Sequence, residues 1–137
     1  MPKLTNKVIV ITGASSGIGA ALARQLASRG EKLVIAARRT AELEKVAAEC
    51  GRDTLPVVTD VTRRADMERL RDAALQAHGR VDVWVNNAGQ GIGRQVMDLT
   101  DADFDQMIAV NTKSAWYGMQ TIIPHFIERG DGHLINV

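Results

Sequence analysis

The sequence predicts an α/β fold with a doubly wound parallel sheet, and three observations support this. Short, almost entirely apolar runs rich in β-branched residues alternate with longer segments that have helical spacing. The runs lack the apolar–polar alternation of a strand with one solvated face, so helices should cover both faces of the sheet. The strand–helix–strand repetition implies right-handed crossovers and parallel strands, in three α/β/α layers.

A chain of 137 residues is the usual size of one domain, and the expected strand order is 3-2-1-4-5. Residues 1–137 are therefore predicted to form a single domain. The expected strands are Val8–Thr12, Leu33–Ala37, Leu55–Thr59, Val81–Val85 and Leu134–Val137. The expected helices are Ile18–Arg29, Ala41–Cys50, Arg63–His78 and Asp101–Arg129.

Capping residues indicate where these helices begin and end. Thr40, Thr62 and Thr100 precede the last three helices as N-cap candidates, because a threonine hydroxyl can accept a hydrogen bond from a first-turn amide. Asp103 stands three residues after Thr100, which is the spacing of a capping box. Gly130 follows the last helix, where a left-handed residue commonly ends a helix.

Composition excludes several kinds of partner. The formal net charge is +1 and both signs are mixed along the chain, which gives no electrostatic basis for binding nucleic acid or an acidic membrane. The first apolar run, Val8–Thr12, is too short to span a membrane. No small-residue site for signal-peptide cleavage follows it, so a signal peptide is not expected. Cys50 is the only cysteine and is expected to be a reduced thiol at a helix end. We therefore expect a cytoplasmic protein.

The turn between the first strand and the first helix has the composition of a phosphate site. Residues 12–19 read TGASSGIG, with the glycines in a G-x-x-x-G-x-G pattern, and Ser15 and Ser16 add hydroxyl donors. Glycines allow close approach of the backbone, and the helix start offers free amides and the positive end of a dipole. No lysine follows the last glycine, so this is not a nucleotide-triphosphate loop. The position in a βαβ unit favours a dinucleotide pyrophosphate over a plain turn.

The residues after the second strand distinguish between two nicotinamide coenzymes. An acid that would bind a free ribose 2′-hydroxyl is absent near Ala37, and Arg38 and Arg39 follow instead. A guanidinium can bind a 2′-phosphate, whereas the structural alternative is a pair of solvated arginines. We therefore predict NADP as the cofactor in preference to NAD. Asp60 and Val61 end the third strand, where they would contact the adenine ring, although Asp60 also suits a simple turn.

Three further segments make the pattern specific. Asn86-Asn87-Ala88-Gly89 ends the fourth strand, Val110-Asn111 lies inside the long helix, and GHLINV forms the fifth strand. With TGASSGIG, in this order and spacing, they resemble the short-chain dehydrogenase/reductase family over essentially the whole chain. The resemblance implies a Rossmann fold and an NADP-dependent oxidoreductase that transfers a hydride between nicotinamide and a small carbonyl compound or secondary alcohol.

The resemblance also implies roles for individual residues. Asn86 would tie the fourth strand to its neighbours, and Asn111 would have a catalytic role by positioning a water in a proton relay. Asn111 also falls on an apolar helical stripe that includes Phe104 and Ile108, where a buried amide must find partners. Metal ligands are not predicted, since the histidines lack partners at metal spacing. The expected coenzyme contacts are Gly13, Ser15, Ser16, Gly17, Ile18, Gly19, Arg38, Arg39, Asp60, Val61, Asn87, Ala88, Gly89 and Val110.

The family's catalytic serine, tyrosine and lysine are expected to fall outside this sequence. The resemblance places the serine directly after the strand that ends at Val137, and the Tyr-x-x-x-Lys pair later. Tyr117 is the only tyrosine, and Thr121 stands four residues after it. We therefore expect residues 1–137 to be an inactive cofactor half with the far edge of the sheet missing. The complete protein would be a homo-oligomer, a dimer or a tetramer.

Two other classes stay open at this point. One is a dinucleotide-binding module without catalysis, which would bind NADPH but reduce no carbonyl compound. The other is an interaction module that keeps the sheet but not the cofactor, and NADPH would leave its thermal stability unchanged.

Overall fold

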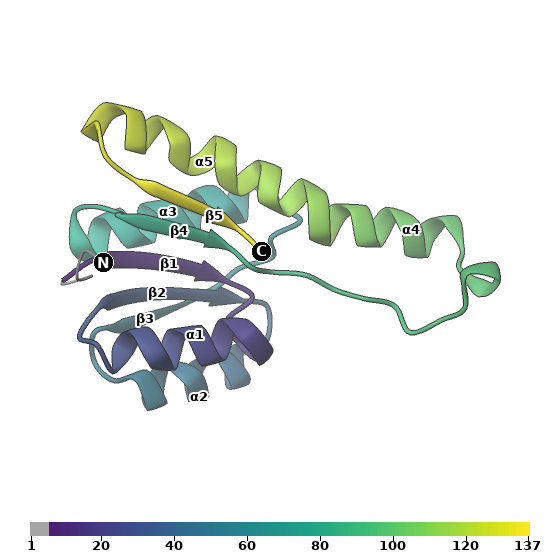
Figure 1. The fold of residues 1–137 in the computed structure, drawn as a ribbon, viewed down its shortest axis with the longest axis horizontal. Helices are drawn as coiled ribbons and strands as arrows, with labels where there is room; N and C mark the ends of the chain where they lie inside the picture. The colour runs from purple at the N-terminus through teal and green to yellow at the C-terminus, as the bar shows by residue number, and fades with distance from the viewer. Residues whose placement is uncertain (1–5) are drawn as a thin grey trace.

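A five-stranded parallel sheet lies between two layers of helices in the computed structural model, which describes residues 6–137 (Figure 1). The strand order is β3-β2-β1-β4-β5, as predicted, and every neighbouring pair is parallel. The predicted fold class is confirmed, and the strand boundaries lie within two residues of the expected ones. The strands are β1 (Val8–Thr12), β2 (Lys32–Ala37), β3 (Thr54–Val58), β4 (Val83–Asn86) and β5 (His133–Asn136).

Both faces of the central strands are covered, as their apolar sequences require, whereas the edge strand β5 is largely exposed. The helices α1 (Gly17–Ala27) and α2 (Thr40–Cys50) cover one face, and α3 (Arg64–His78) and α5 (Ser114–Arg129) cover the other (Figure 1). Alternate residues of each strand point to opposite faces and so enter different cores. Ile9, Ile11, Leu33 and Ile35 pack toward α1 and α2, whereas Val10, Val34 and Trp84 pack toward α3 and α5.

The long helix predicted over residues 101–129 is correct in extent but is not uniform. The helix α4 (Asp101–Ile108) continues into a π-helical segment, η2 (Ala109–Lys113), which leads directly into α5. A short 3₁₀ turn, η1 (Val96–Asp98), precedes α4 and was not predicted. The capping box at the start of α4 and the left-handed Gly130 after α5 are both confirmed. Single π turns inside α-helices often occur at functional sites.

Two of the predicted N-caps are wrong by one residue. Arg39 and Arg63 occupy the N-cap positions of α2 and α3, and neither contributes a side-chain capping bond. Thr40 is already the first residue of α2. The Thr62 hydroxyl donates to Asp60 Oδ1 at 2.7 Å, so it serves the preceding turn and not the helix.

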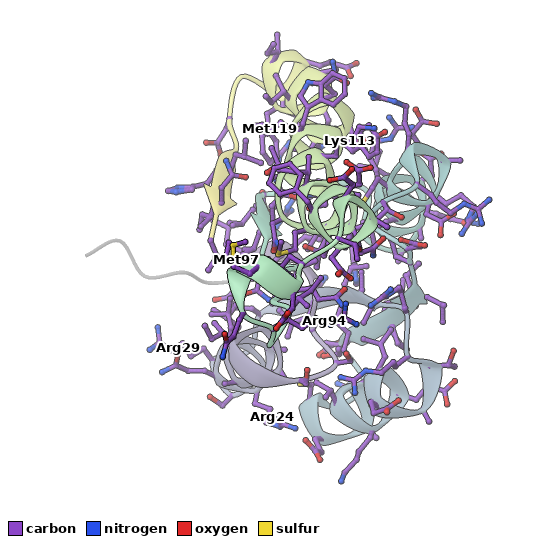
Figure 2. All side chains as sticks on the ribbon, turned by 90° about the vertical axis from the view of Figure 1, so that its right-hand side faces the viewer. Arg24, Arg29, Arg94, Met97, Lys113 and Met119 are labelled. Carbon is purple, nitrogen blue, oxygen red and sulfur yellow. The ribbon has the colours of Figure 1, made fainter. Side chains whose placement is uncertain are left out.

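The segment from η1 through α4 projects beyond the sheet (Figure 1). Figure 2 looks onto this end, where Met97 is 88% exposed and Phe104 57% exposed. The predicted apolar stripe is therefore not buried here: Ile108 is 40% exposed, and Asn111 is exposed as well. The reason is that α4 extends past the end of the sheet, so no strand lies beneath it.

Candidate functional site

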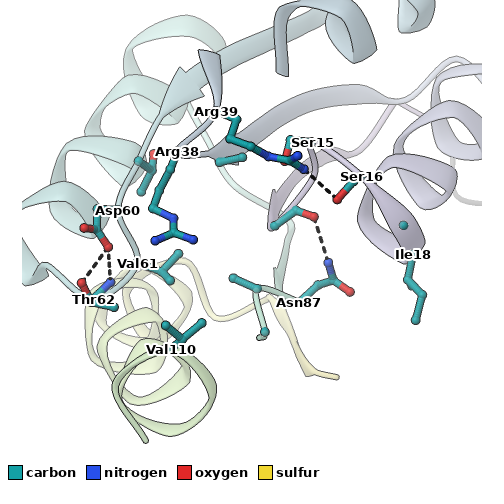
Figure 3. Close-up of a pocket in the computed structure, with 16 residues that line it drawn as sticks. Ser15, Ser16, Ile18, Arg38, Arg39, Asp60, Val61, Thr62, Asn87 and Val110 are labelled. Atoms are coloured by element: carbon teal, nitrogen blue, oxygen red, sulfur yellow. Dashed lines mark hydrogen bonds between the residues drawn. The ribbon is translucent and has the colours of Figure 1, made fainter. Parts of the chain in front are cut away.

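A cleft of about 400 Å³ opens at the carboxyl ends of the central strands (Figure 3). This volume lies within the range of small-molecule sites, roughly 300–1,000 Å³. The cleft lies where the strand order reverses between β1 and β4, which is the usual ligand position in a doubly wound sheet. The predicted residues that line it are Gly13, Ser15, Ser16, Gly17, Ile18, Arg38, Arg39, Asp60, Val61, Asn87, Ala88, Gly89 and Val110.

Three lining residues were missed by the sequence analysis: Ala37, Thr59 and Thr62. Each flanks a predicted residue at the end of β2 or β3, so extending the predicted set by one residue at each strand end would have included them. Two predicted residues, Gly19 and Asn111, lie outside this lining.

The turn after β1 depends on glycine at two positions. Gly13 has a φ of +68°, a left-handed conformation that L residues rarely adopt, and a Cβ there would lie 2.7 Å from Ala88 Cα. Gly19 is buried, and a Cβ on it would collide with the Gly13 carbonyl oxygen and the Asn87 amide. Gly19 therefore lets α1 pack closely against the turn, behind the surface of the cleft.

The Thr12 hydroxyl fixes the loop that follows β4. Its Oγ1 accepts hydrogen bonds from the backbone amides of Asn87 and Ala88, at 3.0 and 3.1 Å, and donates to the Val85 carbonyl at 3.4 Å. The Asn87 side chain in turn donates to the carbonyl oxygen of Thr12 at 3.1 Å and to that of Gly13 at 3.3 Å, and Figure 3 shows the second of these bonds. Thr12 is only 1% exposed and was not predicted as a site residue. The signal that could have found it is a polar residue closing an otherwise apolar strand.

Two arginines at the end of β2 reach the cleft in different ways. Arg39 Nη2 donates to Ser15 Oγ and Ser16 Oγ, at 3.2 and 3.0 Å, and Nη1 lies 3.5 Å from Glu42 Oε1. Arg38 forms neither a side-chain hydrogen bond nor an ion pair with any residue of the 6–137 range, and its guanidinium points into the cleft (Figure 3). Arg38 is thus the cation free to meet an anionic ligand.

Asp60 is an ionised residue at the turn after β3. Its Oδ1 accepts from the Thr62 amide at 3.0 Å and from the Thr62 hydroxyl, and the Asp60 amide donates to Asp66 Oδ2 at 2.9 Å. Burial by itself would raise the pKa of Asp60, but the Thr62 hydrogen bonds and the nearby charges of Arg38 and Arg63 lower it below its ordinary value. Asp60 therefore both stabilises the turn and lines the cleft.

Asn86 joins β4 to the elements around it. Its Oδ1 accepts from Trp84 Nε1 at 2.8 Å, while its Nδ2 donates to Asn136 Oδ1 at 2.9 Å and to the Ala115 carbonyl at 3.3 Å. These contacts match the tying role expected for Asn86. Gly118 makes room for this amide, since a Cβ at that position would collide with it.

Comparison with known proteins identifies the family. Residues 7–137 match the family model described as short chain dehydrogenase. The chain belongs to the short-chain dehydrogenase family. An uncharacterized oxidoreductase of Staphylococcus aureus (strain MW2) is 40% identical over 100% of the chain, and one of Listeria monocytogenes is 42% identical over 96%. The chain spans 60% and 54% of the lengths of these two relatives.

Solved structures of short-chain dehydrogenases superimpose closely on this chain. A 3-ketoacyl-(acyl-carrier-protein) reductase from Brucella melitensis, complexed with NADH, has a TM-score of 0.94 and 37% identity over 98% of this chain and 57% of its own. A metagenomic short-chain oxidoreductase in complex with NADP has a TM-score of 0.88 and 38% identity, over 97% of this chain and 62% of its own.

In this member of the family, Asn111 lies in the π-helical segment and contacts the loop after β4. Its Oδ1 accepts from the Gln90 amide at 2.9 Å, and its Nδ2 donates to the Gln90 carbonyl at 2.8 Å. Both polar atoms are therefore satisfied although the residue is exposed. The contact with Gln90 connects α4 and α5 to the edge of the cleft, and the relay role of Asn111 stays a prediction.

Neither a membrane-crossing helix nor a metal site is found in the part of the chain that the structure describes. Its helices are too short or too polar to cross a membrane. Its His, Cys, Asp and Glu side chains form no group of three that could hold a metal ion.

Proposed function

We propose that this chain is the coenzyme-binding part of an NADP-dependent oxidoreductase. The enzyme would transfer a hydride between the nicotinamide ring and a small carbonyl compound or secondary alcohol. The observation that supports the choice of NADP is Arg38, whose guanidinium points into the cleft and forms no ion pair within residues 6–137. The end of β2 is where this fold distinguishes a ribose 2′-hydroxyl from a 2′-phosphate.

The residues of the cleft suit a nicotinamide dinucleotide. The turn of residues 13–19 brings backbone amides and the start of α1 to one side of the cleft, which favours a pyrophosphate. Arg38 and Arg39 supply positive charge, and Val61 and Val110 supply apolar surface. Relatives of known structure hold NADH, NAD and NADP, so they support the coenzyme class without selecting the phosphorylated form. The bound coenzyme would supply the hydride acceptor or donor.

The chain's own residues would bind and orient the coenzyme. Thr12 and Asn87 would hold the loop after β4 against the glycine turn. Asn111 would hold Gln90 at the rim of the cleft, and we propose that it also positions a water for proton transfer. Asp60 and Val61 would contact the adenine.

The proton donor is proposed to lie elsewhere in the complete protein. The sequence contains one tyrosine, Tyr117, and Thr121 stands where a Tyr-x-x-x-Lys pair requires lysine. Residues 1–137 would therefore form a single coenzyme-binding domain that is inactive alone. The complete protein is proposed to be a cytoplasmic homo-oligomer.

The cofactor assignment is tested by Arg38→Asp in the protein expressed from its complete gene. Calorimetric titration should show NADP⁺ affinity falling by about 10- to 100-fold, because a charge-assisted bond is lost and a repulsive charge is added. NAD⁺ affinity should change little. Arg29→Asp is the matched control, since Arg29 is exposed just after α1, near the amino ends of the strands and away from the cleft. Equal losses for both coenzymes would contradict the phosphate assignment.

A dinucleotide-binding module without catalysis is the second candidate. The observation that favours it is that residues of this chain line the cleft, and binding a dinucleotide needs none of the family's catalytic side chains. If the product of the complete gene binds NADPH but oxidises it with none of a panel of aldehydes and ketones, the module is correct and the reductase proposal is wrong.

A further inference from the structure

The guanidinium of Arg39 is held between the glycine turn and an acid. One nitrogen, Nη2, donates to the hydroxyls of Ser15 and Ser16, and the other, Nη1, lies 3.5 Å from Glu42 Oε1. Arg39 is the N-cap residue of α2, and Glu42 lies in the first turn of the same helix. Residues three apart on a helix are neighbours on its surface, so the helix itself places this carboxylate beside the arginine.

The two serine hydroxyls are left with their protons available. A hydroxyl has one donor proton and two acceptor lone pairs. Because Ser15 Oγ and Ser16 Oγ each accept a hydrogen bond from Arg39, each can donate its proton to another group. Both residues line the cleft, as do Arg38 and Arg39. Two hydroxyl donors beside two guanidinium groups match a phosphate group, whose oxygens only accept when it is fully ionised.

Glu42 opposes this arrangement. Its carboxylate is a like charge for a phosphate, and it already occupies one side of the Arg39 guanidinium. The side chains of Arg39 and Glu42 are 54% and 49% exposed, so water and salt screen the interaction and its effect is modest.

We propose that Glu42 is a specificity-determining residue of this site. It competes with the coenzyme's 2′-phosphate for Arg39 and thereby limits the preference for the phosphorylated coenzyme. This inference rests on the proposed function. The two arginines would then differ: Arg38 is a phosphate ligand without an ion pair in the described residues, and Arg39 is a phosphate ligand whose affinity Glu42 reduces.

The test compares Glu42→Gln with Glu44→Gln in the protein expressed from its complete gene. Glu44 is exposed on the same helix and loses the same charge, but it forms no ion pair within the described residues. In calorimetric titrations at low salt, Glu42→Gln should tighten NADP⁺ binding by about two- to fivefold and leave NAD⁺ binding unchanged. Glu44→Gln should affect neither coenzyme, and the gain should shrink at high salt.

A second background shows whether Glu42 acts through Arg39. In Arg39→Met, the additional Glu42→Gln change should produce no gain in NADP⁺ affinity. The inference is overturned if Glu42→Gln weakens NADP⁺ binding, matches Glu44→Gln, alters NAD⁺ binding equally, or keeps its full effect without Arg39. In any of these cases the proposed function would still be supported if the wild-type protein binds NADP⁺ more tightly than NAD⁺. If the wild type binds neither coenzyme, both proposals fail.

Discussion

Replacing Thr12 by valine tests whether one hydroxyl holds the cleft together. Valine has nearly the shape of threonine, so the packing of β1 is retained while the hydroxyl is lost. The amides of Asn87 and Ala88 then lose their common acceptor, which lies 3.0 and 3.1 Å from them. An unsatisfied buried donor costs about 1–3 kcal/mol. Since both residues are half-buried and water can partly compensate, we expect a loss of about 2–3 kcal/mol for the pair.

The control is Thr12→Ser, which keeps the hydroxyl and removes one buried methyl group, for a loss of about 1 kcal/mol. In urea, Thr12→Val should lower the unfolding midpoint by about 1 M with an unchanged slope, and Thr12→Ser by less than half of that. Thr12→Val should also weaken NADP⁺ and NAD⁺ binding equally, because the loop after β4 lies away from the arginines. A midpoint for the valine variant equal to or above that of the serine variant would refute the reasoning.

Three further predictions concern other contacts of the fold. Gly118→Ala should lower the melting temperature and reduce the free energy of unfolding by about 1–3 kcal/mol, because the added Cβ collides with Asn86. Helix propensity alone predicts that alanine stabilises the helix, so a higher melting temperature would contradict the collision. Asp82→Asn should cost about 3 kcal/mol at pH 7, because this buried carboxylate accepts three hydrogen bonds, two of them from arginines. Burial raises the pKa of Asp82, but these hydrogen bonds lower it overall. The stability that the ionised Asp82 contributes to the fold is therefore fully present above about pH 4 and is lost as the pH falls through the folded-state pKa. The melting temperatures of wild type and variant should accordingly converge in acid. Asn111→Ala should speed hydrogen exchange at the Gln90 amide by about tenfold, and an unchanged exchange rate would exclude the loop-holding role.

Much of the fold was predictable because its strongest signals are local. The runs Val8–Thr12 and Leu33–Ala37 are almost entirely apolar and include β-branched residues, which is typical of strands covered on both faces. The π-helical segment Ala109–Lys113 was missed because a single π turn leaves the spacing of the flanking helical residues nearly unchanged in the sequence. The burial of Asn111 was wrong because a helical stripe does not reveal whether a sheet lies beneath it.

Most residues that line the cleft were predictable, but the hydrogen bonds between them were not. Ser15, Arg38 and Asp60 meet in one cleft because the carboxyl ends of parallel strands lie at one edge of the sheet. The hydrogen bonds from the loop after β4 to Thr12 join residues 75 and 76 positions apart, and no spacing rule indicates such a partner. The hydrogen bonds from Arg39 to the hydroxyls of Ser15 and Ser16 likewise depend on side-chain directions that local sequence does not indicate.

The most direct test of the account is a crystal structure of the protein from its complete gene, grown with saturating NADP⁺. We expect the coenzyme's pyrophosphate to lie against the backbone of residues 13–19 and its 2′-phosphate to contact the Arg38 guanidinium. A 2′-phosphate that lies in solvent away from both Arg38 and Arg39, or a coenzyme bound outside this cleft, would contradict it.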